Sequence, residues 1–155
     1  MGAARRRRVR GRPGCDPARG RGAQRALAVL IDTDVLVAPE RGDEGAGRSA
    51  GDEPRAISVI TVSELLHGVH RATGARRTQR RAFVEHLLAG IEAIPITQPV
   101  ARVHAEIWAE LSAAGRVLGN HDLWIAATAL TYGLGLVTGS ARDFERVPGL
   151  RLLAV

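Results

Sequence analysis

Four carboxylates occupy positions from which they could act together: Asp32, Glu64, Asp122 and Asp143. The first ends a continuous apolar run at residues 26–31, and the last follows a similar run at residues 134–137. The other two stand in the first turns of predicted helices. Carboxylates about 5 Å apart repel one another by on the order of 3 kcal/mol per pair at an effective dielectric of about 20, so a cluster needs protons or cations. Oxygen ligands without thiolates favour Mg²⁺ or Mn²⁺ over zinc.

Each acid also has a purely structural explanation. Asp32 could cap a short helix, and Asp122 would be favoured at a helix N-terminus by the helix dipole alone. Thr61 and Glu64 have the spacing of a capping box, and Ser140 precedes the fourth acid by the same three-residue step. Capping explains each acid singly, but it does not explain four acids at one edge of a sheet, because their mutual repulsion would remain.

Apolar runs of strand length alternate with helical patterns along most of the chain. We expect strands at residues 26–31, 56–60, 91–96, 134–137 and 150–155. We expect helices at residues 33–38, 61–72, 75–88, 100–114 and 122–132, the last capped by Asn120 and ended by Gly133. Unbroken apolar runs indicate strands buried on both faces, so the predicted fold is an α/β domain with a mostly parallel sheet. Ligand sites in such sheets lie beyond the carboxyl ends of the strands, where the acids are expected.

The basic charge of the chain is concentrated near its N-terminus. All 22 basic residues are arginine, and nine of them lie within residues 1–26 beside one acid. That segment carries +8 and the remainder −2, for a net charge of +6. We expect residues 1–26 to be a disordered extension, with an RNA-binding arm, a transit peptide or a misplaced start codon as alternatives. We expect residues 27–155 to form one domain.

Several classes of protein are excluded by composition. A single cysteine, Cys15, excludes a disulfide framework and a thiolate zinc site. No apolar run approaches the roughly 20 residues of a membrane span, and the apolar stretch after the N-terminal arginines is too short for a secretory signal. We therefore expect a cytoplasmic protein without a membrane partner. Residues 39–55, rich in glycine and charge, are expected to form a long loop.

Other motifs offer alternative chemistry. Asp32 and Asp34 after an apolar strand resemble the signature of phosphatases that use an aspartate nucleophile, but those enzymes balance charge with a lysine and this chain has none. His67, His70 and His121 could bind zinc, although three loosely spaced histidines are more typical of ordinary surface or core positions.

Four segments resemble, in order and spacing, the motifs of the PIN-domain family of metal-dependent ribonucleases, most closely its VapC-type toxins. The segments are LIDTDVL at 30–36, TVSELLHG at 61–68, NHDLWIAATA at 120–129 and LVTGSARDF at 136–144. The chain departs from the family pattern in four places, one of which is the long loop at residues 39–55. Ser140 stands where asparagine is usual, Trp124 replaces a commonly aliphatic residue, and Asp34 is an added acid.

The resemblance implies a three-layer α/β/α fold and hydrolysis of RNA phosphodiester bonds. One or two Mg²⁺ ions, or Mn²⁺, would be held by Asp32, Asp122 and Asp143, with Glu64 binding metal through water or positioning the attacking water. It also implies a homodimer and inhibition by a cognate VapB-type antitoxin. A non-catalytic PIN-fold RNA-binding regulator remains the alternative, with Ser140 as its support in the sequence.

Arginines near the motifs are candidates for binding RNA phosphates. Glu64, His67 and Arg71 share one face of the predicted helix, and the next predicted helix carries a cluster formed by Arg76, Arg77, Arg80 and Arg81. The substrate-binding candidates are Arg71, Arg76, Arg77, Arg80, Arg116, Arg142 and Ser140. A solvated helix face is the alternative explanation for the cluster.

Overall fold

The computed structural model describes residues 29–39, 42 and 54–153. The expected N-terminal extension and most of the expected loop at 39–55 lie outside the described residues. The described elements are β1 (Val29–Ile31), α1 (Thr33–Val37), β2 (Arg55–Ser58), α2 (Val59–Arg71), α3 (Gly74–Gly90), β3 (Glu92–Ile94), α4 (Gln98–Ala113), α5 (Asn120–Tyr132), β4 (Gly135–Val137), α6 (Ala141–Phe144) and β5 (Leu152–Leu153). None of the described helices is long and apolar enough to cross a membrane.

The strands form one sheet in the order β3-β2-β1-β4-β5, and every described pair is parallel. β1 lies at the centre, where Leu30 pairs with Ala56 of β2 and with Leu136 of β4. All three residues of β1 are buried, as expected of a strand covered on both faces. The predicted parallel sheet is therefore confirmed, and the carboxyl ends of its strands meet at one edge.

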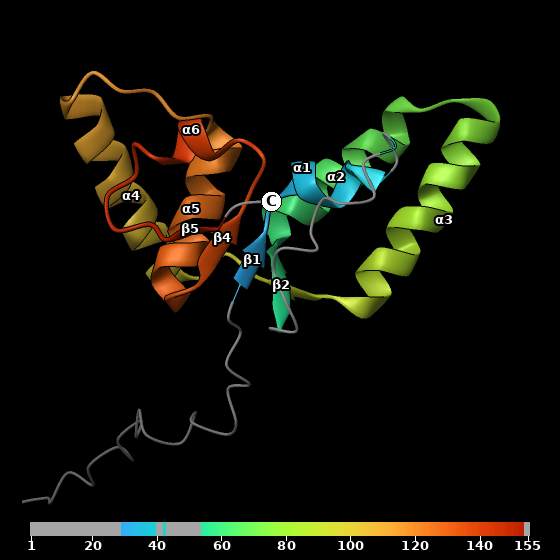
Figure 1. The fold of residues 1–155 in the computed structure, drawn as a ribbon, viewed down its shortest axis with the longest axis horizontal. Helices are drawn as coiled ribbons and strands as arrows, with labels where there is room; N and C mark the ends of the chain where they lie inside the picture. The colour runs from blue at the N-terminus through green and yellow to red at the C-terminus, as the bar shows by residue number, and fades with distance from the viewer. Residues whose placement is uncertain (1–28, 40–41, 43–53, 154–155) are drawn as a thin grey trace, which may run out of the picture.

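Helices cover both faces of this sheet (Figure 1). Leu30, Ala56 and Leu136 point to the face where α4 and α5 pack, and they belong to the larger core cluster. Val29 and Ile31, one residue away on β1, point to the opposite face, toward α1, α2 and α3. Because successive strand residues point to opposite faces, each three-residue strand contributes to both cores. The predicted three-layer α/β/α arrangement is confirmed.

The contact between α4 and α5 gives a packing role to Trp124, which stands where the family commonly has an aliphatic residue. Trp124 of α5 stacks on the ring of His104, which lies in α4, with ring centroids 3.6 Å apart and an interplanar angle of 18°. Burial lowers the pKa of His104, because desolvation between the two helices disfavours the charged ring. An aromatic residue at 124 therefore joins α5 to α4 on the side away from α2 and α3.

Two predicted helix caps are wrong, and a third residue stands at its N-cap position without capping the helix. β2 ends at Ser58, whose side chain accepts a hydrogen bond from the amide of Ile60 at 3.2 Å, so α2 begins two residues earlier than predicted. Thr61 is consequently buried inside α2 and forms no capping box with Glu64. Residue 119, a glycine, takes the N-cap position that we expected of Asn120. Ser140 stands at the N-cap of α6, but its side chain makes no capping hydrogen bond there.

Candidate active site

Asp32 leaves β1 at the carboxyl edge of the sheet and begins α1. Its Oδ1 accepts a hydrogen bond from the amide of Thr33 at 2.7 Å, so the predicted cap is confirmed. Its Oδ2 accepts from the hydroxyl of Thr138, at 2.8 Å, just after the end of β4. Because β1 and β4 are parallel neighbours in register, these two strand ends meet, and the carboxylate is held between them. Asp32 is only 6% exposed.

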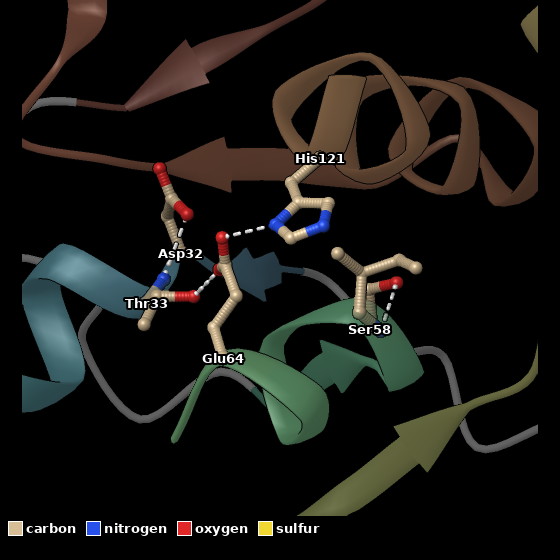
Figure 2. A network of polar contacts seen from close by, with 6 residues as sticks. Asp32, Thr33, Ser58, Glu64 and His121 are labelled. Atoms are coloured by element: carbon tan, nitrogen blue, oxygen red, sulfur yellow. Dashed lines mark hydrogen bonds and ion pairs between the residues drawn. The ribbon is translucent and has the colours of Figure 1, made fainter. Parts of the chain in front are cut away.

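Glu64 reaches the same edge from the second turn of α2. Its Oε2 accepts a short hydrogen bond from the hydroxyl of Thr33, and its Oε1 lies 2.9 Å from Nδ1 of His121 at the start of α5. Figure 2 shows the carboxylate between these two side chains, with Asp32 beyond Thr33. Three elements that are distant in the sequence, α1, α2 and α5, therefore meet at Glu64.

Asp122 lies in the first turn of α5. A Cβ added to Gly119 would stand 2.7 Å from Oδ2 of Asp122, so the glycine provides the room in which this carboxylate lies. Burial raises the pKa of Asp122, and the negative charges of Glu64 and Asp143 raise it further. His121 opposes this shift.

The carboxylates also interact electrostatically around Asp32. Burial raises the pKa of Asp32 to about 6, and the charges of Asp34 and Asp122 act in the same direction. The hydrogen bonds from Thr138 and from the amide of Thr33 favour the ionised form and oppose the shift. The ionised form of a buried acid with such neighbours is unfavourable, and binding of a proton or of a cation removes this free-energy cost.

One cavity of about 260 Å³ collects these side chains, and we call it the acid cavity. Its lining residues are Asp32, Thr33, Asp34, Val37, Glu64, Asp122 and Ser140. Three of the four predicted acids therefore line one cavity, in agreement with the expected convergence. Ser140, a predicted substrate contact, lines it too.

Asp143 lies beside this cavity and is not part of its lining. Its side chain is 60% exposed, and one of its oxygens is 3.4 Å from the guanidinium of Arg146. Asp143 instead lines a neighbouring cavity of about 480 Å³ together with Arg142 and Ser140. Its charge still acts on Asp122, which shows that the two carboxylates are near one another.

Asp34 closes the loop that follows β4. Its carboxylate accepts hydrogen bonds from the amide of Gly139 and the hydroxyl of Ser140, each at 3.1 Å. This structural role explains the Asp-x-Asp spacing without an aspartate nucleophile of the phosphatase type. It also explains why Ser140 makes no cap for α6, since its hydroxyl points to Asp34.

Sequence analysis missed three residues that contact the acids. Thr138 follows β4 directly and Thr33 is one residue beyond Asp32, so the rule that located Asp32 at a strand end points to the same short segments. His121 was considered only as a zinc ligand, although it precedes Asp122 in the third motif. The structure gives it a different role, as a partner of Glu64.

The donor set of the acid cavity fits a hard divalent cation. The donors are carboxylates and hydroxyls, which Mg²⁺ and Mn²⁺ prefer. The pKa values of Asp32 and Asp122 are raised mainly by burial and further by neighbouring carboxylates, and a bound cation would offset both effects. Within the described residues, no three His, Cys, Asp or Glu side chains already surround a single point as metal ligands would. Any ion would therefore draw the carboxylates closer together.

The predicted arginines divide into two groups. Arg71, Arg76 and Arg80 line a cavity of about 470 Å³ that also includes Glu64, and we call it the arginine cavity. Arg77 and Arg116 are exposed and line neither this cavity nor the acid cavity. Of the predicted arginines on α2 and α3, the structure therefore brings Arg71, Arg76 and Arg80 to the same cavity as Glu64.

Comparisons with known proteins agree with this geometry. A family model described as the PIN domain matches residues 29–150. The chain is 33% identical over 130 residues to Ribonuclease VapC1 of Rickettsia felis, covering 83% of this chain and 97% of the relative. It is 30% identical over 128 residues to the tRNA(fMet)-specific endonuclease VapC of Shigella flexneri, covering 81% and 96%.

Two solved structures share the fold over most of their length. VapBC2 from Rickettsia felis, bound to a DNA fragment from its promoter, gives a TM-score of 0.75 at 25% identity, covering 83% of this chain and 99% of that chain. DNA-bound VapBC from Salmonella typhimurium gives a TM-score of 0.69 at 29% identity, covering 83% and 98%.

Proposed function

The chain belongs to the PIN-domain family, and from that premise we propose that it is a metal-dependent endoribonuclease, the toxin of a VapBC-type toxin–antitoxin pair. Relatives named as VapC ribonucleases, one of them a transfer-RNA endonuclease, support the nuclease activity. The observation that carries the proposal is the convergence of Asp32, Glu64 and Asp122 on one cavity, with the pKa values of both aspartates raised.

In this mechanism the aspartates bind the cation and Glu64 acts beside them. Asp32 and Asp122 would hold Mg²⁺ or Mn²⁺ together with Asp143, whose charge reaches Asp122. The chemistry that the ion supplies when bound is a lowered pKa of water and stabilisation of charge on the phosphate. It also allows a polyanionic substrate to approach carboxylates that would otherwise repel it.

Glu64 is assigned to positioning the attacking water. Both of its oxygens are held, one by the hydroxyl of Thr33 and one by Nδ1 of His121, so the carboxylate has a defined orientation. An oriented carboxylate can accept a hydrogen bond from water and so align it for attack on phosphorus. This arrangement supports action through water rather than direct contact with the cation.

The proposed partners are RNA as substrate, a VapB-type antitoxin as inhibitor and a second copy of the chain in a cytoplasmic homodimer. Support for the antitoxin comes from the solved relatives, which are VapBC assemblies. An antitoxin segment that enters the acid cavity would have to present a cation to its carboxylates.

Cleavage of RNA by the purified chain tests the proposal. We expect cleavage with Mg²⁺ or Mn²⁺, loss with a chelator, and a fall on the order of 1000-fold in Asp32→Asn, because several kcal/mol of transition-state stabilisation would be removed. Glu106→Gln, which removes an exposed carboxylate of α4, is the matched control and should cleave normally. Binding of RNA without metal-dependent cleavage would instead favour the non-catalytic regulator.

A further inference from the structure

The arginine cavity lies between α2 and α3 and shares Glu64 with the acid cavity. It is lined by Glu64 and His67 at one end and by Gly68, Arg71, Arg76 and Arg80 beyond them. Arg76 and Arg80 also line a further cavity of about 300 Å³ with Gln79 and Phe83. Neighbouring cavities that share lining residues thus run from the carboxylates along the groove between the two helices.

Arg80 differs from the other arginines of its helix. Its side chain is half-buried, whereas Arg76, Arg77 and Arg81 are exposed. A Cβ added to Gly68 would stand only 3.0 Å from the central carbon and one terminal nitrogen of the Arg80 guanidinium. The guanidinium therefore lies directly against α2, in space that exists because residue 68 has no side chain.

Glycine inside a helix normally costs about 1 kcal/mol relative to alanine. Gly68 lies in the last third of α2, where its flanking residues have regular helical structure and no turn requires glycine. Its position against Arg80 gives the glycine a packing role, because an alanine methyl group would require the guanidinium to shift by a few tenths of an ångström.

The charges of the two cavities are opposite. The arginine cavity has three guanidinium groups and one carboxylate, that of Glu64, among its lining residues. The acid cavity has four carboxylates and no arginine among its lining residues. A ligand that spans both must be anionic beside α3 and must tolerate carboxylates beside β1.

We propose that the arginine cavity binds a backbone phosphate of the RNA strand next to the bond that is cleaved, and that Gly68 positions Arg80 for this contact. The inference rests on the proposed ribonuclease function. It implies that the RNA strand runs from the acid cavity at β1 along the groove between α2 and α3. Guanidinium groups bind phosphate oxygens through paired, charge-assisted hydrogen bonds.

An acidic peptide is the competing ligand for the same arginines. The shared residue Glu64 argues against it, since a peptide with carboxylates along its length would bring them to the acid cavity. An RNA strand has one phosphate per nucleotide, so a phosphate beside Arg80 leaves the next one for the divalent cation. Successive phosphates of one RNA strand can therefore bind the arginines of one cavity and the cation in the other.

Binding of a fluorescently labelled single-stranded RNA of mixed sequence tests the inference, with Mg²⁺ present and Asp32→Asn as a background that prevents cleavage. We expect Arg80→Ala to raise the Kd about tenfold, as for removal of a hydrogen bond to a charged group. The slope of log Kd against log salt should fall by about 0.7, because the variant neutralises one phosphate fewer on a single strand. Arg81→Ala removes the same charge from the same helix and should change the Kd less than about twofold.

Gly68→Ala displaces the guanidinium without changing any charge. We expect it to raise the Kd by less than Arg80→Ala does, because the guanidinium must shift by only a few tenths of an ångström. The double variant should bind no more weakly than Arg80→Ala alone, because both changes act on the same interaction. The fold should be kept, since the atoms that must move belong to the end of a flexible side chain and alanine favours helix. Circular dichroism and thermal unfolding of each variant check this directly.

Two results would overturn the inference. One is equal binding by the Arg80→Ala and Arg81→Ala variants while the wild type cleaves RNA with Mg²⁺. The other is a poly-glutamate peptide whose binding depends on Arg80 when RNA binding does not. If Arg80 and Gly68 control RNA binding but the wild type cleaves no RNA with any divalent ion, the phosphate contact stands and the proposed nuclease function fails.

Discussion

The acid cavity and the arginine cavity share Glu64 but are built in different ways. The carboxylates stand at strand ends and helix starts, and hydrogen bonds from Thr33, Thr138 and His121 hold two of them in place. The arginines stand on exposed helix faces, and among those of α3 Arg80 is the one that lies against α2. Chemistry at a phosphate depends on atomic placement, whereas attraction of a polyanion depends mainly on charge, so the two regions meet different demands.

This contrast predicts that the acid cavity is destabilising when it holds no cation. The unfolded carboxyl of Asp32 titrates near its ordinary pKa of 3.8, and the folded one has a pKa of about 6. Between these pH values the folded state keeps a proton that the unfolded state has lost, so stability falls as pH rises through this window and stays lower above it.

Asp32→Asn should therefore raise the stability of the protein in chelator, by about 3 kcal/mol at pH 7 and above, and by little below a pH of about 4. Asparagine retains one oxygen, which can accept the hydrogen bond from the Thr33 amide, and its amide nitrogen can donate to the Thr138 hydroxyl. Thermal unfolding of the two proteins across pH measures the difference. If the variant were less stable than the wild type at neutral pH in chelator, the ionised Asp32 carboxylate would not destabilise the folded protein, and the prediction would be wrong.

Two glycines allow the cavities to be compared directly. Gly119→Ala places a methyl group against the Asp122 carboxylate, so we expect kcat to fall about 100-fold, as for a misplacement of about 1 Å at a reacting centre. Gly68→Ala should act mainly on KM. Steady-state cleavage of one RNA by both variants tests this, and the same kinetic parameter changing in both would break the distinction between the cavities.

The hydroxyl of Thr33 should matter through Glu64. Thr33→Val keeps the shape of the side chain and removes the hydrogen bond to Glu64, so kcat should fall about tenfold with little change in KM. Thr33→Ser keeps the hydroxyl and should restore most of the rate. Equally low rates in the two variants would point to packing rather than orientation of the carboxylate.

Ser140→Asn should have the smallest effect. The change introduces the residue usual in the family at a position where the side-chain hydroxyl donates to Asp34, so we expect the rate to change less than about threefold. Comparison of cleavage rates at saturating Mg²⁺ provides the measurement. A large gain in activity would mean that serine had disabled the site, as the non-catalytic alternative requires.

Motif spacing and apolar runs were enough to predict the parallel sheet, the two helical layers and the acids of the site. The caps expected of Thr61 and Asn120 are wrong because α2 and α5 each begin two residues earlier than predicted, which makes Ser58 and Gly119 the N-cap residues. Ser140 stands at an N-cap, but its hydroxyl donates to Asp34 instead. The sequence could not decide between Ser58 and Thr61, because only packing buried Thr61 within α2.

The sequence by itself determined the chemistry available, because residue types decide which atoms can bind a cation or a phosphate. Alternation of strands and helices then required Asp32 to lie at the edge of a parallel sheet. Only the tertiary structure decided that Glu64 is held by Thr33 and His121 and that Asp143 lies beside the acid cavity. It also decided that Arg80 rather than Arg77 lines the arginine cavity with Glu64. The reason is that these pairings join helices distant along the chain, and their rotation and packing depend on the whole core.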